Sequence, residues 1–163
     1  MTKHLYLIRH ALAESQGAGL KDFDRSLLTS GYSEASRIGK KLSDKGIAVD
    51  KVISSNATRA AMTTELICSQ IKFPLSNVIF EQDIYEASVR SLLSLINNTE
   101  ENINTLMIVG HNPVISYFSE YLVSEQIGAL PTAGVVAIEL EVNSWKEVTA
   151  STGKIEFLEY PES

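Results

Sequence analysis

Two histidines of this chain follow short apolar runs of sequence, and an arginine precedes the first of them. Residues 5–8 are apolar and lead into Arg9 and His10, and residues 106–109 are apolar and lead through a glycine to His111. Short, fully apolar runs are typical of buried strands in parallel sheets, whose ligands bind just beyond the carboxyl ends of the strands. The chain has three histidines in all. Two of them at predicted strand ends therefore indicate a site at this edge of a sheet.

Two further arginines lie where they could join this site. Arg59 follows a polar segment, residues 54–58, at the end of another predicted strand, and Arg25 lies in a polar loop. Guanidinium groups bind phosphate oxygens through paired hydrogen bonds, and the amides of helix N-termini also face anions. Two or three arginines together with two histidines therefore predict a receptor for an oxyanion.

A histidine surrounded by such cations is expected to stay neutral and to keep a nitrogen lone pair. A neutral imidazole can attack phosphorus, so the pattern indicates phosphoryl transfer through a phosphohistidine. The sequence contains no P-loop pattern and no carboxylate–histidine spacing typical of a metal site. We therefore expect the reaction to need no metal and no cofactor.

Each of these residues also has an ordinary structural interpretation when it is taken alone. His10 or His111 could be a hydrogen-bonded structural histidine, Arg59 a solvated charge early in a helix, and Arg25 a loop charge. The functional interpretation rests on their shared position at strand ends and on one chemistry that uses them all.

The elements that must position these residues alternate along the chain. Strands are expected at residues 5–8, 50–54, 78–80 and 106–109, followed by two closing strands, an antiparallel pair, at 134–140 and 154–160. Helices are expected between them, over residues 30–45, 57–73, 88–97 and 113–122.

Strand and helix patterns that alternate in this way predict an α/β protein, a three-layer α/β/α sandwich with a mainly parallel central sheet. Thr29 or Ser30, Asn56 and Asn112 are expected to cap three of the helices, the last with a proline in the first turn. The sequence shows no linker, internal repeat or low-complexity segment, so we expect a single domain over residues 1–163.

The composition is that of an ordinary soluble protein, with 44% hydrophobic and 21% charged residues. A formal net charge of -6 argues against nucleic acid or an anionic membrane as partner, since both need a basic surface. The lone Cys68 excludes an internal disulfide and is expected to be buried. Because the first expected strand begins almost at Met1, we expect no signal peptide. Because no apolar run is long enough to cross a bilayer, we expect no membrane span. We expect a cytoplasmic protein.

The residues of the predicted site also resemble a known family, the histidine phosphatase superfamily with its phosphoglycerate-mutase-like fold. Arg9-His10-Ala11 resembles its Arg-His-Gly motif, residues 55–63 its Ser-Pro-x-x-Arg-Ala-x-x-Thr segment, and residues 109–113 its second-histidine motif. Residues 24–27 and 85–87 resemble elements of the short, SixA-type branch of phosphohistidine phosphatases. These motifs run in family order from residue 5 to about residue 113.

The resemblance implies a role for each site residue. His10 would be the nucleophile that becomes the phosphohistidine, and Arg9, Arg59 and His111 would bind the phosphoryl oxygens, with Arg25 as a further contact. Glu86 matches the position of the proton donor in many members of the superfamily. Its alternative interpretation is a carboxylate at the start of a helix, stabilised by the macrodipole.

The chain departs from the family pattern at three positions. Ala11 replaces the usual glycine after the nucleophile, and Asn56 and Ser26 each replace a proline. None of these changes removes a catalytic group. We therefore expect an active enzyme.

The loops are too short to predict a lid, and an open pocket suits a bulky substrate. The resemblance thus favours a phosphorylated protein, carrying phosphohistidine, as the partner. Two alternatives remain open at this point, a phosphomonoesterase for a small phosphate ester such as a sugar phosphate, and a module that binds phosphate or phosphopeptides without turnover.

Overall fold

A six-stranded mixed sheet forms the centre of the computed structural model, which describes residues 2–17 and 19–162. The strand order is β3-β2-β4-β1-β5-β6. The parallel part consists of β1 (Lys3–Arg9), β2 (Lys51–Ser55), β3 (Ile79–Glu81) and β4 (Thr105–Gly110). β5 (Val135–Leu140) and β6 (Gly153–Glu159) complete it as antiparallel strands. The expected mainly parallel sheet and its antiparallel closing pair are confirmed.

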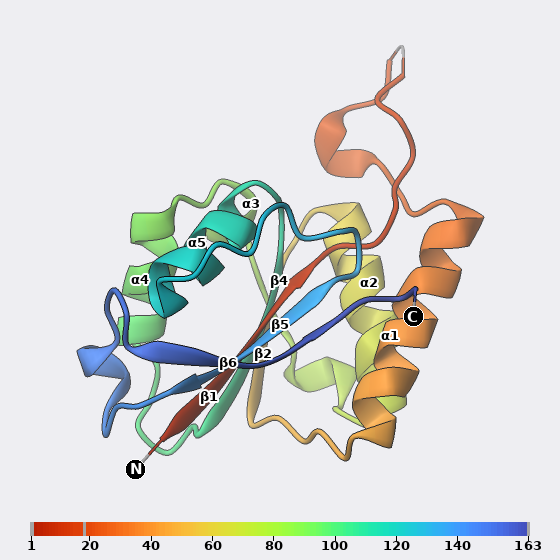
Figure 1. The fold of residues 1–163 in the computed structure, drawn as a ribbon. Coiled ribbons are helices and arrows are strands. Elements are labelled where there is room, and N and C mark those ends of the chain that lie inside the picture. Colours follow the sequence, from red (N-terminus) through yellow and green to blue (C-terminus); the bar gives the residue numbers. More distant parts are fainter. Residues whose placement is uncertain (1, 18, 163) are drawn as a thin grey trace.

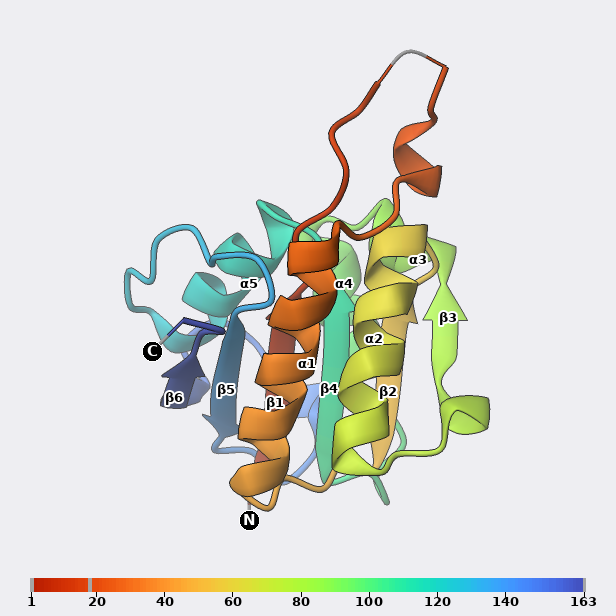
Figure 2. The ribbon, with the colours of Figure 1, turned by 90° about the vertical axis from the view of Figure 1, so that its right-hand side faces the viewer.

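Helices cover both faces of this sheet, so the expected three layers are confirmed (Figures 1 and 2). One face carries α1 (Thr29–Asp44) and α2 (Thr58–Ile71). The other carries α3 (Gln82–Tyr85), α4 (Val89–Asn97) and α5 (Val114–Val123). Short 3-10 turns lie at η1 (Asp22–Asp24), η2 (Leu75–Asn77) and η3 (Trp145–Glu147).

The apolar strands are buried on both sides because successive side chains point to opposite faces of a sheet. Leu5 and Leu7 of β1 pack in the cluster that includes α4 and α5, whereas Tyr6 and Ile8 pack in the cluster that includes α1 and α2. Cys68 of α2 is buried in this second cluster, as expected. Two cores, one on each face, thus hold the sheet and fix where its strands end.

The predicted helix caps are wrong at three helices, although the helices themselves are present. α1 begins at Thr29 with Leu28 as its N-cap, and α2 begins at Thr58 with Ala57 as its N-cap, and neither cap makes a side-chain hydrogen bond. The Oδ1 atom of Asn56 is buried and has no partner among the described residues. Next to it, the Ser55 hydroxyl rather than Asn56 accepts from the amide of Ala57, so Asn56 does not cap the helix.

At α5 the expected cap is replaced by a tertiary contact. Pro113 takes the N-cap position, and Asn112 donates from Nδ2 to the Leu130 carbonyl at 3.0 Å while its Oδ1 accepts from Ser116. By contrast, the expected start of α4 is confirmed. Ser88 caps it and forms a reciprocal capping box with Ser91.

The segment between β1 and α1 rises beyond the carboxyl edge of the parallel strands (Figures 1 and 2). An antiparallel bridge between Ala13 and Leu27 joins its two arms near the sheet, and η1 lies on the returning arm. Within the described residues, no helix is both long and apolar enough to cross a membrane.

Candidate active site

The two histidines lie side by side because the strands that precede them are neighbours. β1 pairs with β4 in parallel, with Arg9 opposite Gly110, so His10 and His111 leave the sheet together. Their ring centroids are 5.2 Å apart, and each residue is only 8% exposed. The sequence prediction that both histidines belong to one strand-end cluster agrees with this geometry.

His10 is held as a neutral ring whose Nε2 atom carries the lone pair and faces Nε of Arg59. Its Nδ1 lies 2.7 Å from the Ala11 carbonyl, which can only accept, so Nδ1 carries the proton and Nε2 the lone pair. Burial lowers the pKa of His10 to about 4, and the charges of Arg59, Arg9 and Arg25 act in the same direction against the bond to Ala11. At neutral pH the Nε2 atom is therefore unprotonated, as a nucleophilic imidazole nitrogen has to be.

His111 is oriented by a serine at the end of β2. Its Nε2 lies 2.8 Å from Oγ of Ser55, and this Oγ also accepts from the Ala57 amide at 3.1 Å. The buried Ser55 hydroxyl has no other acceptor among the described residues, so we assign it as the donor to Nε2 and place the ring proton on Nδ1. Nδ1 of His111 is buried and has no partner among the described residues. Burial lowers the pKa of His111 to about 3, with contributions from His10 and Arg59, so this ring is also neutral.

Arg59 enters the site from the first turn of α2 and is 5% exposed. Its Nε faces Nε2 of His10 at 3.4 Å. Its two terminal nitrogens donate to Asp22, one to the backbone carbonyl at 2.7 Å and one to Oδ2 at 3.0 Å. Arg59, which the sequence places among the candidate residues of this site, therefore lies next to His10.

Arg25 joins the same cluster through Asp22. Its Nε and Nη2 donate to Oδ1 of Asp22 at 3.0 and 2.8 Å, and its Nη1 donates to the Glu14 carbonyl at 2.6 Å. Arg9 precedes His10 in the chain, its Nη1 donates to the Leu130 carbonyl at 2.9 Å, and its buried Nε has no partner among the described residues. Burial lowers the pKa of Arg9.

The contacts of Thr63 explain the spacing between arginine and threonine in the Arg-Ala-x-x-Thr pattern of α2. Thr63 lies one turn after Arg59, on the same face of the helix, and its hydroxyl donates to the Arg59 carbonyl. The same hydroxyl accepts from the amide of Ala11 at 2.9 Å. Thr63 thus attaches the segment after His10 to the helix that carries Arg59.

Sequence reasoning missed Asp22 and Tyr85 as site residues. The Tyr85 hydroxyl donates to Oδ2 of Asp22 at 2.6 Å, and its ring meets His111 edge-on with centroids 5.4 Å apart. Hydrogen bonds from Tyr85, Arg25 and Arg59 hold the pKa of Asp22 well below its usual range. The available signal for Asp22 was its position three residues before Arg25, a spacing at which the two side chains can meet within one turn.

Glu86 makes no hydrogen bond to the other predicted site residues in the described part of the chain. It is exposed, it follows the last residue of α3, and its carboxylate accepts from Nε2 of Gln82 at 3.3 Å. Glu86 is the C-cap of α3 and lies two residues before Ser88, the N-cap of α4, whose first turn contains no acidic residue. Tyr85, the residue before it, is the one that contacts the site.

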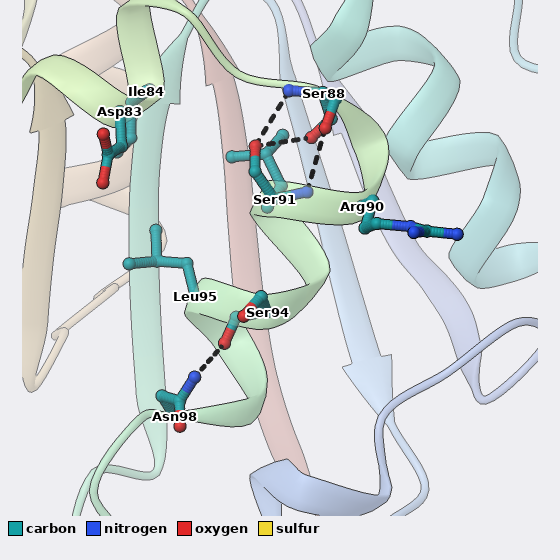
Figure 3. A pocket seen from close by; sticks show the side chains of 9 residues that line it. Asp83, Ile84, Ser88, Arg90, Ser91, Ser94, Leu95 and Asn98 are labelled. Carbon is teal, nitrogen blue, oxygen red and sulfur yellow. Dashed lines mark hydrogen bonds between the residues drawn. The ribbon is translucent and has the colours of Figure 1, made fainter.

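A hollow of about 510 Å³ opens between α3 and α4, and Figure 3 shows the side chains around it. Asp83 and Ile84 line it from α3, and Arg90 and Leu95 are among those that line it from α4. None of the residues predicted for the site lines this hollow. Within residues 2–17 and 19–162, no group of three or more His, Cys, Asp or Glu side chains is placed to hold a metal ion.

Comparisons with known proteins agree on the family. The model of the histidine phosphatase superfamily (branch 1) matches residues 5–95. An uncharacterized protein of Mycobacterium tuberculosis is 31% identical over 151 residues, which cover 86% of this chain and 91% of the relative. The mitochondrial serine/threonine-protein phosphatase PGAM5 of Xenopus tropicalis is 41% identical over 66 residues, which cover 40% of this chain and 23% of the relative.

Solved structures share the fold over nearly the whole chain. A candidate phosphohistidine phosphatase, SixA from Agrobacterium tumefaciens, superimposes with a TM-score of 0.84 at 26% identity and covers 98% of both chains. The protein histidine phosphatase SixA complexed with tungstate, with a TM-score of 0.83, 19% identity and 97% of both chains covered, shows the same fold. The expected phosphoglycerate-mutase-like fold is confirmed. The chain belongs to the histidine phosphatase superfamily, is of the SixA type, and is a phosphatase.

Proposed function

We propose that this phosphatase acts through a covalent phosphohistidine on His10 and that its substrate is a protein that carries phosphohistidine. The observation that carries the proposal is the contact of His10 Nδ1 with the Ala11 carbonyl, which leaves the lone pair on Nε2, facing Arg59 in a buried, cationic site. In the first step Nε2 attacks phosphorus, the new N–P bond forms, and the bond from phosphorus to the substrate breaks. Water then cleaves the phosphohistidine, and inorganic phosphate leaves.

The proposed ligands of the phosphoryl group are Arg9, Arg25, Arg59 and His111. Guanidinium groups stabilise the charge on the equatorial oxygens of a phosphoryl transition state. Because the guanidinium groups of Arg9, Arg25 and Arg59 supply the positive charge that a metal ion supplies elsewhere, we propose a metal-independent reaction. Full activity after exhaustive dialysis against a chelator is the expected result, and restoration only by an added divalent cation would contradict it.

A proton donor such as Glu86 matters more for a phosphate ester than for phosphohistidine. A departing imidazole has an ordinary pKa of about 6.5 and leaves readily when protonated, whereas an alkoxide needs a strong proton donor held close to it. Glu86 is exposed and bonded to Gln82. As part of the proposal, Glu86 protonates the leaving oxygen of any ester that the site accepts. Glu86→Gln should then slow ester hydrolysis more than phosphohistidine hydrolysis.

Purified protein offered a phosphohistidine protein and a panel of sugar phosphates tests the substrate class. We expect release of phosphate from the phosphohistidine protein, with an acid-labile phosphoenzyme in rapid-quench samples. His10→Ala should abolish the phosphoenzyme and leave the circular dichroism spectrum unchanged. Turnover of sugar phosphates alone would indicate a small-molecule phosphomonoesterase, and a wild-type protein that binds phosphate but never forms a phosphoenzyme would indicate a binding module.

A further inference from the structure

Asp22 connects three elements of the site through one carboxylate. Oδ1 accepts two hydrogen bonds from Arg25, and Oδ2 accepts one from Arg59 and one from the Tyr85 hydroxyl. Its backbone carbonyl accepts a further bond from Arg59. The loop after β1, the first turn of α2 and the end of α3 are therefore joined at this residue.

The contacts determine which edge of the Arg59 guanidinium faces the nucleophile. Both terminal nitrogens are engaged by Asp22, which leaves the Nε–H directed at Nε2 of His10. A guanidinium group is planar and its donors are fixed relative to one another, so a clamp on one edge orients the other. Without the clamp, a long side chain with several rotatable bonds would sample other directions.

We propose that Asp22 is a positioning residue, which holds Arg59 and Arg25 in the geometry that receives the phosphoryl group at His10. This inference rests on the proposed function, because it assigns to Arg59 and Arg25 the role of binding the phosphoryl oxygens. Asp22 acts through the arginines and does not itself contact the reacting atoms.

Asp22 is suited to orient and unsuited to transfer protons. An ionised carboxylate has about four acceptor positions, and those of Asp22 are filled by Arg25, Arg59 and Tyr85. The same hydrogen bonds keep it ionised, so it has no proton to give to a leaving group. Its negative charge also offsets the repulsion between two guanidinium groups that share it.

Asp24 provides a matched control within the same turn. It lies two residues further along η1, is exposed, and makes no side-chain hydrogen bond or ion pair among the described residues. Asp24→Asn removes the same charge from the same loop without touching either arginine. Any effect specific to Asp22→Asn therefore reports the clamp rather than the net charge of the loop.

The test compares the two variants by turnover and by affinity for inorganic phosphate. Asp22→Asn should lower kcat by about 10- to 100-fold, since small misplacement of a catalytic group costs up to that much. Its Kd for phosphate should stay within about threefold of wild type or decrease, because the variant loses a negative charge near the anion. Asp24→Asn should match wild type in both, and Asp22→Glu should recover part of kcat. Equal kcat in wild type and Asp22→Asn, or an equal loss in both variants, would overturn the inference.

A second readout does not depend on turnover. The NMR signal of the Arg59 Nε–H should be protected from solvent exchange in wild type and in Asp24→Asn, and should exchange at least about tenfold faster in Asp22→Asn. An unchanged signal in Asp22→Asn would overturn the clamp even if the wild type proved inactive, in which case the proposed function would fail separately. Tyr85→Phe removes one of the four side-chain bonds to the carboxylate and should shift both readouts in the same direction by less. If Asp22→Asn does not fold, Tyr85→Phe still tests the inference through the same two measurements.

Discussion

At the scale of the residue, the chemistry depends on which nitrogen of each histidine carries the proton. The Ala11 carbonyl places the proton of His10 on Nδ1, and the Ser55 hydroxyl places that of His111 on Nδ1 as well. One ring therefore offers a lone pair at Nε2, and the other offers an N–H donor. The proposed roles of nucleophile for His10 and oxyanion donor for His111 thus fall to two residues of the same type, because their neighbours differ.

The role of Ser55 can be tested directly. Ser55→Ala removes the donor to His111 Nε2, so the ring is free to take the other tautomer and its donor to the phosphoryl oxygen is lost. We expect kcat to fall by about 10-fold or more and the ¹⁵N NMR spectrum to show a mixture of His111 tautomers. Ser54→Ala is the control, because Ser54 is also buried but bonds to Thr64 and to the Ser55 carbonyl. Identical ¹⁵N shifts of His111 in wild type and Ser55→Ala would contradict this assignment.

The pKa of His10 also predicts the acid limb of the reaction. Because that pKa is lowered to about 4, the lone pair is retained well below the usual range of histidine. The rate of phosphoenzyme formation, corrected for ionisation of the substrate, should fall only as the pH drops toward about 4. Rapid-quench measurements between pH 3.5 and 8 check this. An acid limb near pH 6.5 would show that His10 is not desolvated in the working enzyme.

At the scale of the element, a close approach between α1 and the chain after the nucleophile holds the loop in place. A Cβ atom on Gly31 would lie 2.0 Å from the Leu12 carbonyl oxygen, which also accepts from the Leu28 amide at 3.0 Å. Backbone lies on both sides of this contact, so neither side can yield without displacing residues next to His10.

Gly31→Ala should therefore lower the free energy of unfolding by about 1–3 kcal/mol, the usual cost of overpacking. Urea titration measures it. Gly17→Ala serves as the control, because a Cβ atom there meets nothing within 4 Å, and it should stay within about 0.5 kcal/mol of wild type. Equal stability of the two variants would show that the loop adjusts freely.

The start of α4 offers a prediction of the same kind. Ser88→Ala removes the side-chain acceptor for the Ser91 amide and one half of the capping box. We expect a loss of about 1 kcal/mol in the free energy of unfolding. Ser94→Ala, on an exposed position of the same helix, should be neutral or slightly stabilising. A Ser88 variant as stable as the Ser94 variant would mean that tertiary packing alone determines where α4 begins.

At the scale of the whole molecule, the buried histidines couple the stability of the fold to pH. The pKa values of His10 and His111 are lowered to about 4 and about 3, from an ordinary value of 6.5 in the unfolded chain. Between pH 6.5 and 4 the unfolded state binds protons that the folded state does not. The free energy of unfolding must therefore decrease as the pH falls through this window.

Urea titrations at pH 7 and pH 5 should show this decrease, and a His10→Asn, His111→Asn double variant should show a smaller one. The lower pH of the comparison is 5, because carboxylates titrate mainly below pH 5 and therefore contribute little to the measured difference. Carboxylates such as Asp22, whose pKa is depressed in the fold, add to the loss at still lower pH. The same pH dependence in wild type and double variant would show that neither histidine is held neutral by burial.

Much of this architecture could be predicted from local patterns, because a strand buried on both faces leaves a continuous apolar run and a helix leaves its own period. The caps at Asn56 and Asn112 could not be predicted. Ser55 takes the amide of Ala57, and Asn112 bonds to Leu130 and Ser116, in place of a local capping preference worth about 1 kcal/mol. α3 was missed because four residues are too few to show a helical period.

The sequence alone determined the order in which strands and helices alternate along the chain. It also determined the positions of His10 and His111 at strand ends and the arginines that accompany them. These follow from hydrophobic periodicity and from motif spacing, which are properties of neighbouring residues. Only the tertiary structure decided that Asp22 joins Arg25 to Arg59, that Ser55 orients His111, and that Tyr85 rather than Glu86 contacts the cluster. Those contacts join residues up to 63 positions apart in the chain, so they depend on how loops and strands pack in three dimensions, which no local pattern encodes.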